Sequence, residues 1–127
     1  MLCPCHSGKK YKTCCESLHQ DGRAENALAL MRSRYAAYAL SNADYIIKTT
    51  HPLNPHYNKN FEEWKKEILI FCQKTEFKDL RILASSLTSV TFLAILSYNG
   101  QDASFTEKST FECVDGNWLY LSGEVSR

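Results

Sequence analysis

The sequence has neither a long apolar run nor an apolar leader at its start. The longest apolar stretch, VTFLAIL at 90–96, is far shorter than the roughly 20 residues that a transmembrane helix needs. The opening residues MLCPCHSGKK are polar and basic, whereas a signal peptide carries an apolar segment. These absences argue against a transmembrane protein and a secreted one, so we expect no membrane span and a cytoplasmic location.

An excess of charge of one sign is also missing. Fifteen Lys and Arg residues stand against 14 Asp and Glu residues, and the formal net charge is +1. This balance argues against a protein that coats nucleic acid over its whole surface. The sequence has no internal repeat and no low-complexity tract, and it is 44% hydrophobic and 12% aromatic. A chain of 127 residues with this composition predicts one globular domain, with room for a small appendage.

Cysteines, in contrast, are numerous and unevenly placed. Four of the six lie within residues 3–15, CPCHSGKKYKTCC. In a reducing compartment, clustered cysteines hold a metal more often than they form disulfides. Structural zinc takes four ligands in a tetrahedron, and cysteine sulfur is a common one. This stretch therefore predicts a metal site, with zinc as the expected ion.

Two pairs of cysteines would supply the four ligands. Cys3 and Cys5 are one residue apart, and eight residues separate them from the adjacent Cys14 and Cys15. A loop of that length can turn back, with its sharp turn at Gly8, because glycine tolerates a positive φ. We therefore predict one structural Zn²⁺ bound by these four thiolates.

Three other interpretations of this stretch remain open. Cys14 and Cys15 can be small buried residues, although some twenty mostly polar residues offer little core to bury them. A redox disulfide is the second, but the C-x-C and C-C spacings differ from the C-x-x-C redox motif. In the third, His6 replaces one cysteine as a ligand.

Three lysines lie inside the same stretch, at Lys9, Lys10 and Lys12. Four thiolates around one Zn²⁺ leave two negative charges, and nearby lysines would offset them. Exposed on a folded zinc element, the lysines would also form a basic face for an acidic protein surface or for RNA. Charge neutralisation alone is the alternative.

The first half of the chain has helical periodicity. We expect a cysteine-rich unit over 1–20, HQDG at 19–22 as a linker, and a second unit over 21–127. Helices are predicted from Ala24, after a cap at Ser41 or Asn42, and from Asn60. Apolar residues line one face of the first and third helices: Leu28, Met31, Tyr35 and Tyr38, then Phe61, Trp64, Ile68 and Phe71. The third helix should dock by its aromatic stripe.

The second half changes to the period of strands. Leu80 and Ile82 alternate with polar neighbours, and residues 90–98 are apolar on both faces, which predicts a central strand covered on both sides. Turn signals at NGQD and DGN then separate strands over 105–113 and WLYL. Helices followed by antiparallel strands predict an α+β domain in which a curved sheet wraps around a long helix.

The stretch CPCHSGKKYKTCC resembles the SEC-C motif, the small zinc-binding element at the C-terminus of the preprotein translocase ATPase SecA. The resemblance covers residues 2 to about 18 and implies zinc on Cys3, Cys5, Cys14 and Cys15. It also implies contact with an acidic protein or the ribosome. The family usually has Gly where this chain has His6, and a positive φ at that position would strain His6 somewhat, although His tolerates it better than most residues.

Further stretches resemble the YchJ family: RSRYAAYA (32–39), DYIIKTTHP (44–52), FEEW (61–64), and EKSTF to DGNWLYLSG (107–123). This resemblance implies a cystatin-like α+β roll, similar to that of nuclear transport factor and ketosteroid isomerase. Family members often carry a second SEC-C copy after the roll, and this sequence shows none. Cys72 and Cys113 have no partners at ligand spacing, so we predict core thiols.

Two functions follow from these features. The first is a binding module, because a four-cysteine site has no open coordination position and cannot activate water. An enzyme is therefore the less favoured interpretation. The alternative is a small-molecule-binding or catalytic roll with an aromatic-lined pocket near His51. Its candidate lining residues are Tyr35, Tyr38, Tyr45, His51, Trp64, Glu107, Phe111 and Trp118.

Three further histidines, His19, His51 and His56, lie outside the cysteine-rich stretch at residues 3–15. His51 can serve as an acid–base group near neutral pH, and Glu107 can be a buried carboxylate inside the pocket. His51 directly precedes Pro52 at the end of a predicted helix, which favours a structural hydrogen bond instead. His19 and His56 are predicted to lie on the surface.

Overall fold

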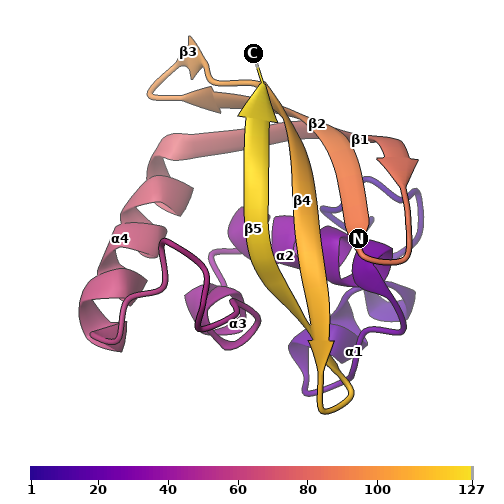
Figure 1. The fold of residues 1–127 in the computed structure, drawn as a ribbon. Coiled ribbons are helices and arrows are strands. Elements are labelled where there is room, and N and C mark those ends of the chain that lie inside the picture. Colours follow the sequence, from indigo (N-terminus) through magenta and orange to yellow (C-terminus); the bar gives the residue numbers. More distant parts are fainter. Residues whose placement is uncertain (127) are drawn as a thin grey trace.

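A computed structural model of the chain describes residues 1–126. Helices come first and an antiparallel sheet follows, so the predicted α+β class is confirmed (Figure 1). The helical elements are η1 (Tyr11–Thr13), α1 (Glu16–His19), α2 (Ala27–Ala39), α3 (Ala43–Lys48) and α4 (Phe61–Lys74). The strands are β1 (Thr75–Ser85), β2 (Ser89–Tyr98), β3 (Gln101–Asp102), β4 (Phe105–Val114) and β5 (Asn117–Ser126). Below, "the cysteine element" is residues 1–20 and "the roll" is the part from α2 to β5.

An asparagine caps the start of each of the three longer helices. The Asn26 side chain accepts a hydrogen bond from the Ala29 amide at 2.8 Å. Asn42 and Asn60 accept in the same way from the amides three residues later, each at 3.1 Å. These bonds satisfy amides that the first helical turn leaves without a partner. Asn42, rather than Ser41, is thus the cap of α3.

The sheet has the strand order β1-β2-β4-β5, and β3 pairs with β2. Two tight turns connect its hairpins. Asn99 and Gly100 have φ values of 51° and 79°, and Asp115 and Gly116 have values of 52° and 81°. Two successive positive φ values are the signature of a type I′ hairpin turn, so both predicted turns are confirmed. Figure 1 shows the sheet curling around α2.

β2 is central, as predicted, but the prediction that both its faces are covered is wrong. Val90, Phe92, Ala94 and Leu96 are buried, whereas Leu93 and Ile95 between them stay partly exposed. This alternation is the pattern of a strand that packs on one face only. Within residues 1–126, no helix is both long and apolar enough to span a membrane.

The roll has two cores, and α2 contributes residues to both. One joins α2 to the inner face of the sheet through Leu30, Met31 and Tyr35. The other joins α2 to α3 and α4, and it contains Trp64, Ile68 and Cys72. The buried stripe of α4 therefore differs from the predicted one, since Phe61 and Phe71 remain partly exposed at its edges.

Candidate metal centre and central cavity

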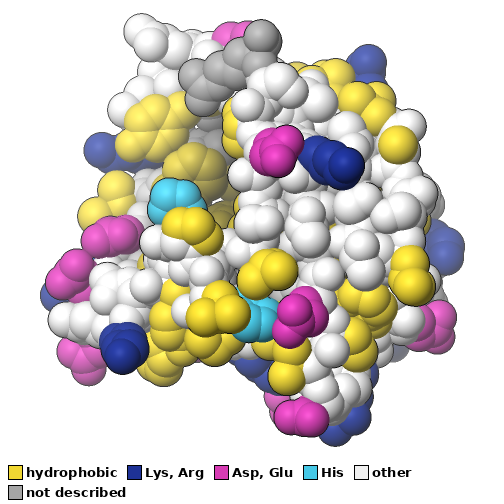
Figure 2. Space-filling view, in the orientation of Figure 1, with side chains coloured by type: hydrophobic (Ala, Val, Ile, Leu, Met, Phe, Trp, Pro, Cys, Tyr) yellow, Lys and Arg dark blue, Asp and Glu magenta, His cyan; other side chains and the backbone are white. Residues whose placement is uncertain are grey.

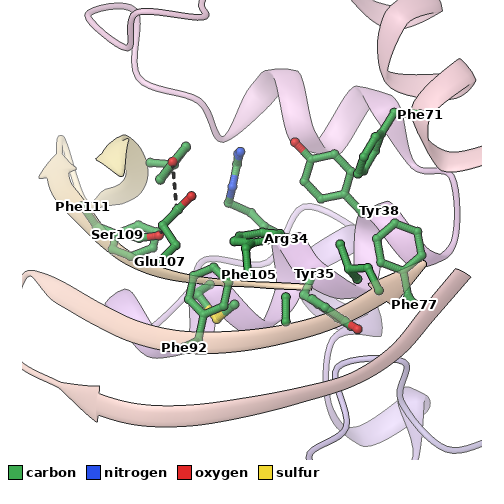
Figure 3. A pocket seen from close by; sticks show the side chains of 14 residues that line it. Arg34, Tyr35, Tyr38, Phe71, Phe77, Phe92, Phe105, Glu107, Ser109 and Phe111 are labelled. Atoms are coloured by element: carbon green, nitrogen blue, oxygen red, sulfur yellow. Dashed lines mark hydrogen bonds between the residues drawn. The ribbon is translucent and has the colours of Figure 1, made fainter. Parts of the chain in front are cut away.

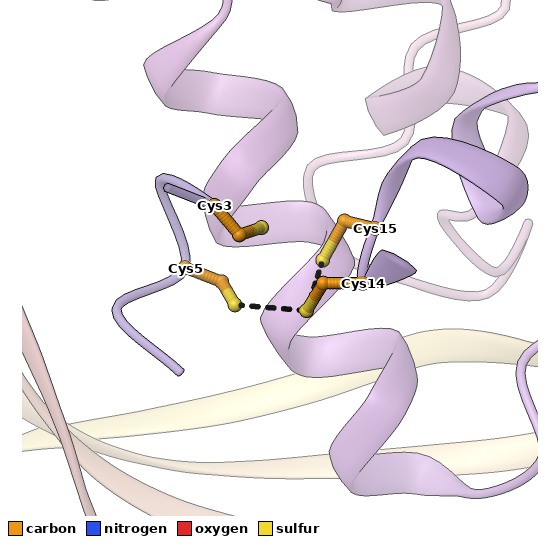
Figure 4. Close-up of side chains that lie close together, drawn as sticks. All are labelled: Cys3, Cys5, Cys14 and Cys15. Carbon is orange, nitrogen blue, oxygen red and sulfur yellow. Dashed lines mark hydrogen bonds between the residues drawn. The ribbon is translucent and has the colours of Figure 1, made fainter. Parts of the chain in front are cut away.

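The four clustered cysteines converge on one point, as Figure 4 shows. Their sulfur atoms all lie within 4.8 Å of one another. The Sγ atoms of Cys5 and Cys14 are 3.6 Å apart, and those of Cys14 and Cys15 are 3.8 Å apart. A tetrahedral zinc with Zn–S bonds of about 2.3 Å has sulfur atoms about 3.8 Å from each other. The sulfur positions therefore fit a tetrahedral metal ion, and no pair is close enough for a disulfide.

Local turns bring the two pairs of cysteines together. Cys3 donates its backbone N–H to Lys9 at 2.8 Å, which closes the first loop. Gly8 turns that loop with a φ of 85°, and His6 has a φ of 59°. His6 thus adopts a positive φ at the position where the resembling family usually has Gly. A single 3₁₀ turn, in which Cys14 donates to Tyr11 at 3.0 Å, then delivers the second pair.

The cluster distributes negative charge unequally among its sulfurs. A hydrogen bond from Cys15 is the main reason that the pKa of Cys5 falls to about 4. Burial raises the pKa of Cys3 to about 11, and the hydrogen bond to Cys5, with burial, raises the pKa of Cys15. By itself the chain thus favours the thiolate at Cys5 and disfavours it at Cys3 and Cys15. A divalent cation among the sulfurs would hold all four as thiolates, which is the donor set that zinc takes.

His6 lies outside this group of sulfurs. Its Nδ1 is 3.7 Å from the Asp79 carboxylate, and its ring meets the Tyr35 ring edge-on at 5.9 Å. The described residues that could share a metal here are the four cysteines, without His6. The arrangement therefore gives no support to His6 as a replacement ligand.

The cysteine element packs on α2. Arg32 donates a hydrogen bond from Nη1 to the Cys5 carbonyl at 3.0 Å, and Ala36 is buried among the cysteines. Tyr11 packs on the same cluster, and its hydroxyl lies 2.7 Å from Nδ1 of His19. Nε2 of His19 is 2.8 Å from the Ser33 carbonyl. The surface position predicted for His19 is therefore wrong, because this ring links the element to the helix.

The three lysines of the element are exposed. Lys9, Lys10 and Lys12 form no ion pair with any carboxylate in the part of the chain that the structure describes. Met1 and Leu2 lie beside them, since Leu2 bridges to Lys10, and their exposed fractions are 74% and 69%. The element thus presents basic and apolar groups together.

A second candidate site is a cavity of about 200 Å³ between α2 and the inner face of the sheet (Figure 3). Its lining residues are mostly aromatic or aliphatic: Met31, Arg34, Tyr35, Tyr38, Phe71, Phe77, Phe92, Ala94, Leu96, Phe105, Glu107, Ser109, Phe111 and Tyr120. Figure 2 shows the surface hollowed between α4 and β5, with hydrophobic atoms at the base of the hollow. Two charged side chains, Arg34 and Glu107, line this otherwise apolar space.

Glu107 is held in place by two hydroxyl groups. Ser109 donates a hydrogen bond to its Oε2, and the Tyr120 hydroxyl donates to the same atom at 3.0 Å. Burial, followed by the nearby Glu107 charge, raises the pKa of Tyr120. Gly123 leaves room for this network, because a Cβ atom there would lie 2.6 Å from Oε2 of Glu107.

Arg34 is buried and has only neutral hydrogen-bond partners. Its Nη1 donates to the Ile46 carbonyl at 3.0 Å and to the hydroxyls of Thr49 and Thr50 at 2.7 and 3.1 Å. The guanidinium also lies over the Tyr120 ring, 4.7 Å from its centroid. Arg34 was not among the residues predicted to line a pocket. The available signal was an arginine at helical spacing between the apolar residues of the face that α2 buries.

The cavity does not lie at His51, where the sequence predicted a pocket. Of its candidate residues, Tyr35, Tyr38, Glu107 and Phe111 line the cavity, and Tyr45, His51, Trp64 and Trp118 do not. Trp64 and Tyr45 point into the other core, on the side of α3 and α4. Trp118 pairs with Cys113 towards the outer end of the β4–β5 hairpin.

His51 joins the end of the α3 segment to the sheet. Its backbone N–H donates to the Tyr120 carbonyl at 2.9 Å, and its Nδ1 accepts from the Leu53 amide at 3.0 Å. Its Nε2 lies 3.1 Å from the Glu112 carboxylate. These contacts are the structural hydrogen bonds that its place before Pro52 favours.

Of three further positions, two agree with the predicted burial and one does not. His56 is exposed, as expected, and Cys72 is buried. The prediction that Cys113 is a core thiol is wrong, because Cys113 is exposed near the tip of the β4–β5 hairpin, which projects from the body in Figure 1.

Comparison with known families accounts for both parts of the chain. The SEC-C motif matches residues 2–17, which include the four clustered cysteines. The YchJ middle NTF2-like domain matches residues 26–123, which include all the residues that line the cavity.

Similar proteins occur in several bacteria. A UPF0225 protein of Deinococcus radiodurans is 38% identical over 121 residues, covering 94% of this chain and 85% of the relative. A UPF0225 protein of Enterobacter sp. is 33% identical over 129 residues, covering 96% of this chain and 82% of the relative. Most of each relative therefore aligns with this chain.

Two solved structures share the fold. The solution structure of a SEC-C motif containing protein from Rhodopseudomonas palustris matches with a TM-score of 0.80 and 34% identity, over 100% of both chains. The crystal structure of a SEC-C motif containing protein from Psychrobacter arcticus has a TM-score of 0.73 and 24% identity, over 98% of this chain and 82% of that one, which shows the fold alone. The chain therefore belongs to the YchJ family, in which it joins a SEC-C motif to an NTF2-like domain.

Proposed function

We propose that the chain binds one structural Zn²⁺ through Cys3, Cys5, Cys14 and Cys15, and that the folded cysteine element binds an acidic partner protein. The observation that carries this proposal is the set of four sulfur atoms within 4.8 Å of one another, in a loop with three exposed lysines. The proposed role is binding rather than catalysis. Thiolate ligands must stay reduced, so the site suits a reducing compartment such as the cytoplasm.

The metal organises the element. Four protein ligands leave a tetrahedral zinc ion no open coordination position for water or substrate, so the ion has a structural role. The cysteine element has little core of its own beyond the cysteines, Tyr11 and Ala36. Metal binding then supplies the free energy that keeps its loop folded.

An acidic protein surface suits this element better than RNA does. Lys9, Lys10 and Lys12 offer positive charge, and the exposed Met1 and Leu2 beside them offer apolar area. A partner with acidic groups around an apolar centre would pair with both features. Three charges alone make a small footprint for a phosphate backbone.

Metal content tests the first half of this proposal. Elemental analysis of the purified protein should find one zinc per chain, and Co²⁺ in its place should give the absorption bands of a tetrahedral thiolate site. Cys14→Ser should lower the affinity for either ion. Two zinc ions per chain, or none after gentle purification, would contradict the assignment.

The partner is tested with two labelled probes, an acidic amphipathic peptide and a single-stranded RNA. The triple variant Lys9→Gln, Lys10→Gln and Lys12→Gln should bind the peptide more weakly than the wild type, and the difference should shrink as salt rises. A matched control replaces three exposed lysines elsewhere, Lys59, Lys66 and Lys74. An RNA partner would be indicated if the RNA bound more strongly than the peptide and if the logarithm of its association constant fell with the logarithm of the salt concentration with a slope of about −2. If both triple variants bound the peptide equally well, Lys9, Lys10 and Lys12 would not form a binding surface and would serve only to balance the charge of the metal site.

A second candidate function is small-molecule binding by the roll. The cavity of about 200 Å³ favours it, since ligand sites are concave, mostly apolar and equipped with a few polar groups. The proposed site is centred on Arg34 and Glu107 rather than on His51.

A further inference from the structure

We propose that the central cavity binds a small single-ring carboxylate and that the guanidinium of Arg34 pairs with the carboxylate of that ligand. This inference rests on the second function proposed above, small-molecule binding by the roll. It adds the chemical class of the ligand and the residue that anchors it.

Arg34 carries a positive charge that has no charged partner among the described residues. Only 8% of this residue is exposed, and its hydrogen bonds run from Nη1 to one carbonyl and two hydroxyl groups, all neutral. No carboxylate within residues 1–126 comes within 4.0 Å of its guanidinium nitrogens. Buried charged side chains are usually paired with an opposite charge, because removing a charge from water is costly. A ligand anion would supply the missing partner.

The hydrogen-bond donors of the Arg34 guanidinium suit a carboxylate. All three hydrogen bonds of Arg34 come from Nη1, so among the described residues its Nε and Nη2 have no hydrogen-bond acceptor and stay available to a ligand in the cavity that the residue lines. Figure 3 shows the guanidinium between Glu107 on one side and Tyr38 on the other, above the rings of Phe92 and Phe105. A planar guanidinium matches a carboxylate through two parallel hydrogen bonds, which a lysine ammonium cannot reproduce.

The volume and the aromatic walls of the cavity favour a ligand with a single ring. A cavity of about 150 Å³ with apolar walls accepts benzene, so a volume of about 200 Å³ suits one ring with a short substituent. Rings surround this space on several sides: Tyr35, Tyr38, Phe71, Phe77, Phe92, Phe105, Phe111 and Tyr120. Aromatic walls pack against a ring edge-to-face or with an offset, which favours a flat apolar body.

Glu107 limits the ligand further. Its Oε2 is occupied by Ser109 and Tyr120, and no hydrogen bond to its Oε1 is present among the described residues. This negative group in the same cavity disfavours a second acidic group on the ligand and accepts a hydrogen bond from a hydroxyl. The ligand class is therefore a monocarboxylate, with a hydroxyl as a favourable substituent.

The test uses benzoate and the three hydroxybenzoates as probes, with benzamide as a neutral control of the same shape. Titrations followed by NMR on the full chain should show saturable binding of at least one carboxylate probe, with Kd below about 1 mM. Benzamide should bind at least about tenfold more weakly. The perturbed signals should belong to residues that line the cavity.

Three variants locate the site. Ala94→Leu fills the cavity with apolar atoms and should abolish binding while the chain stays folded, as checked by circular dichroism. Arg34→Met should abolish the preference for carboxylate over amide. Arg32→Met is the matched control, because this arginine of the same helix contacts Cys5 instead of the cavity. If Arg34→Met fails to fold, the comparison of benzoate with benzamide and the Ala94→Leu variant still decide the matter.

The outcomes separate the two proposals. Equal binding of benzamide and the carboxylates at the cavity would overturn the role of Arg34 and leave small-molecule binding intact. Failure of every probe to bind would overturn the carboxylate inference and also count against small-molecule binding. Binding that Ala94→Leu leaves unchanged would show that the site lies elsewhere and would overturn the inference.

Discussion

His6 has a backbone conformation that few residues other than glycine adopt. Its φ of 59° lies in the left-handed region, in which a Cβ atom crowds the following carbonyl. Contacts of its ring with Tyr35 and Asp79 accompany this conformation. The residue therefore combines backbone strain with side-chain contacts, and two substitutions can separate these contributions.

We expect His6→Ala to lower the free energy of unfolding of the zinc-loaded protein, since it removes the ring contacts and keeps the strained φ. His6→Gly removes the same contacts and also the strain, so it should be more stable than His6→Ala by about 1 kcal/mol. Urea unfolding of both variants measures the difference. An alanine variant as stable as the glycine variant would show that the strain is negligible.

The contribution of Tyr120 to stability should depend on pH. Burial and the Glu107 charge raise its pKa above the ordinary value of 10.0. Its contribution to stability is complete below about pH 10 and is lost as pH rises towards the folded-state pKa, since the unfolded chain releases the proton first.

The free energy of unfolding should consequently fall above about pH 10, by up to about 1.4 kcal/mol per pH unit for each such tyrosine. Tyr120→Phe removes one titrating group, so the free energy of unfolding of this variant should fall less steeply as pH rises. At neutral pH the variant should be less stable than the wild type, because it lacks the hydrogen bond to Glu107. Urea unfolding at a series of alkaline pH values measures both slopes. Parallel slopes for variant and wild type would contradict the role given to Tyr120.

At the scale of elements, the asparagine caps explain where the helices begin. Asn26, Asn42 and Asn60 each accept a hydrogen bond from an amide of the first turn. α4 depends strongly on this cap, because only one side of the helix is buried and Asn60 lies at its exposed start. Packing through Trp64, by contrast, holds the middle of the helix.

Asn60→Ala should therefore lower the free energy of unfolding by about 1 kcal/mol, since the amide of Glu63 loses its acceptor. Asn60→Asp keeps an acceptor and places a negative charge at the helix start, so its stability should equal or exceed that of the wild type. Thermal unfolding of the three proteins compares them. A loss in the aspartate variant as large as in the alanine variant would mean that the side chain acts in some other way.

At the scale of the whole molecule, the cysteine element and the roll differ in what stabilises them. The roll buries two apolar cores, whereas the element buries mainly its own cysteines against Ala36. The bonds from Arg32 to Cys5 and from His19 to Ser33 attach one to the other. We therefore treat the element as metal-dependent and the roll as independent of metal.

Removal of the metal by a chelator, or the Cys14→Ser substitution, should disorder residues 1 to about 18 and leave the roll folded. Amide signals in the roll should persist except near Arg32 and Ala36, and protease should cleave only the N-terminal segment. The cooperative thermal transition of the roll should remain, with a lower midpoint because the docking contacts are lost. Disappearance of that transition would show that the two parts fold as one unit.

The sequence by itself determined the features that depend on neighbours along the chain. The four cysteines lie within 13 residues, so local turns suffice to gather their sulfurs and the motif could be identified directly. The Asn99–Gly100 and Asp115–Gly116 turns were equally predictable, because their positive φ values are a local property of those residues.

Only the tertiary structure decided which side chains share the cavity. Arg34 comes from α2 and Glu107 from β4, and the curvature of the sheet brings both to one apolar space. His51 and Trp64 lie outside that space, although their chemistry made them candidates, and Trp64 packs instead in the core between α3 and α4. The contact of His19 with α2 and the exposure of Cys113 were likewise decided by docking and by the projecting hairpin. The physical reason is that burial depends on contacts between residues far apart in the sequence, whose direction and distance no local pattern specifies.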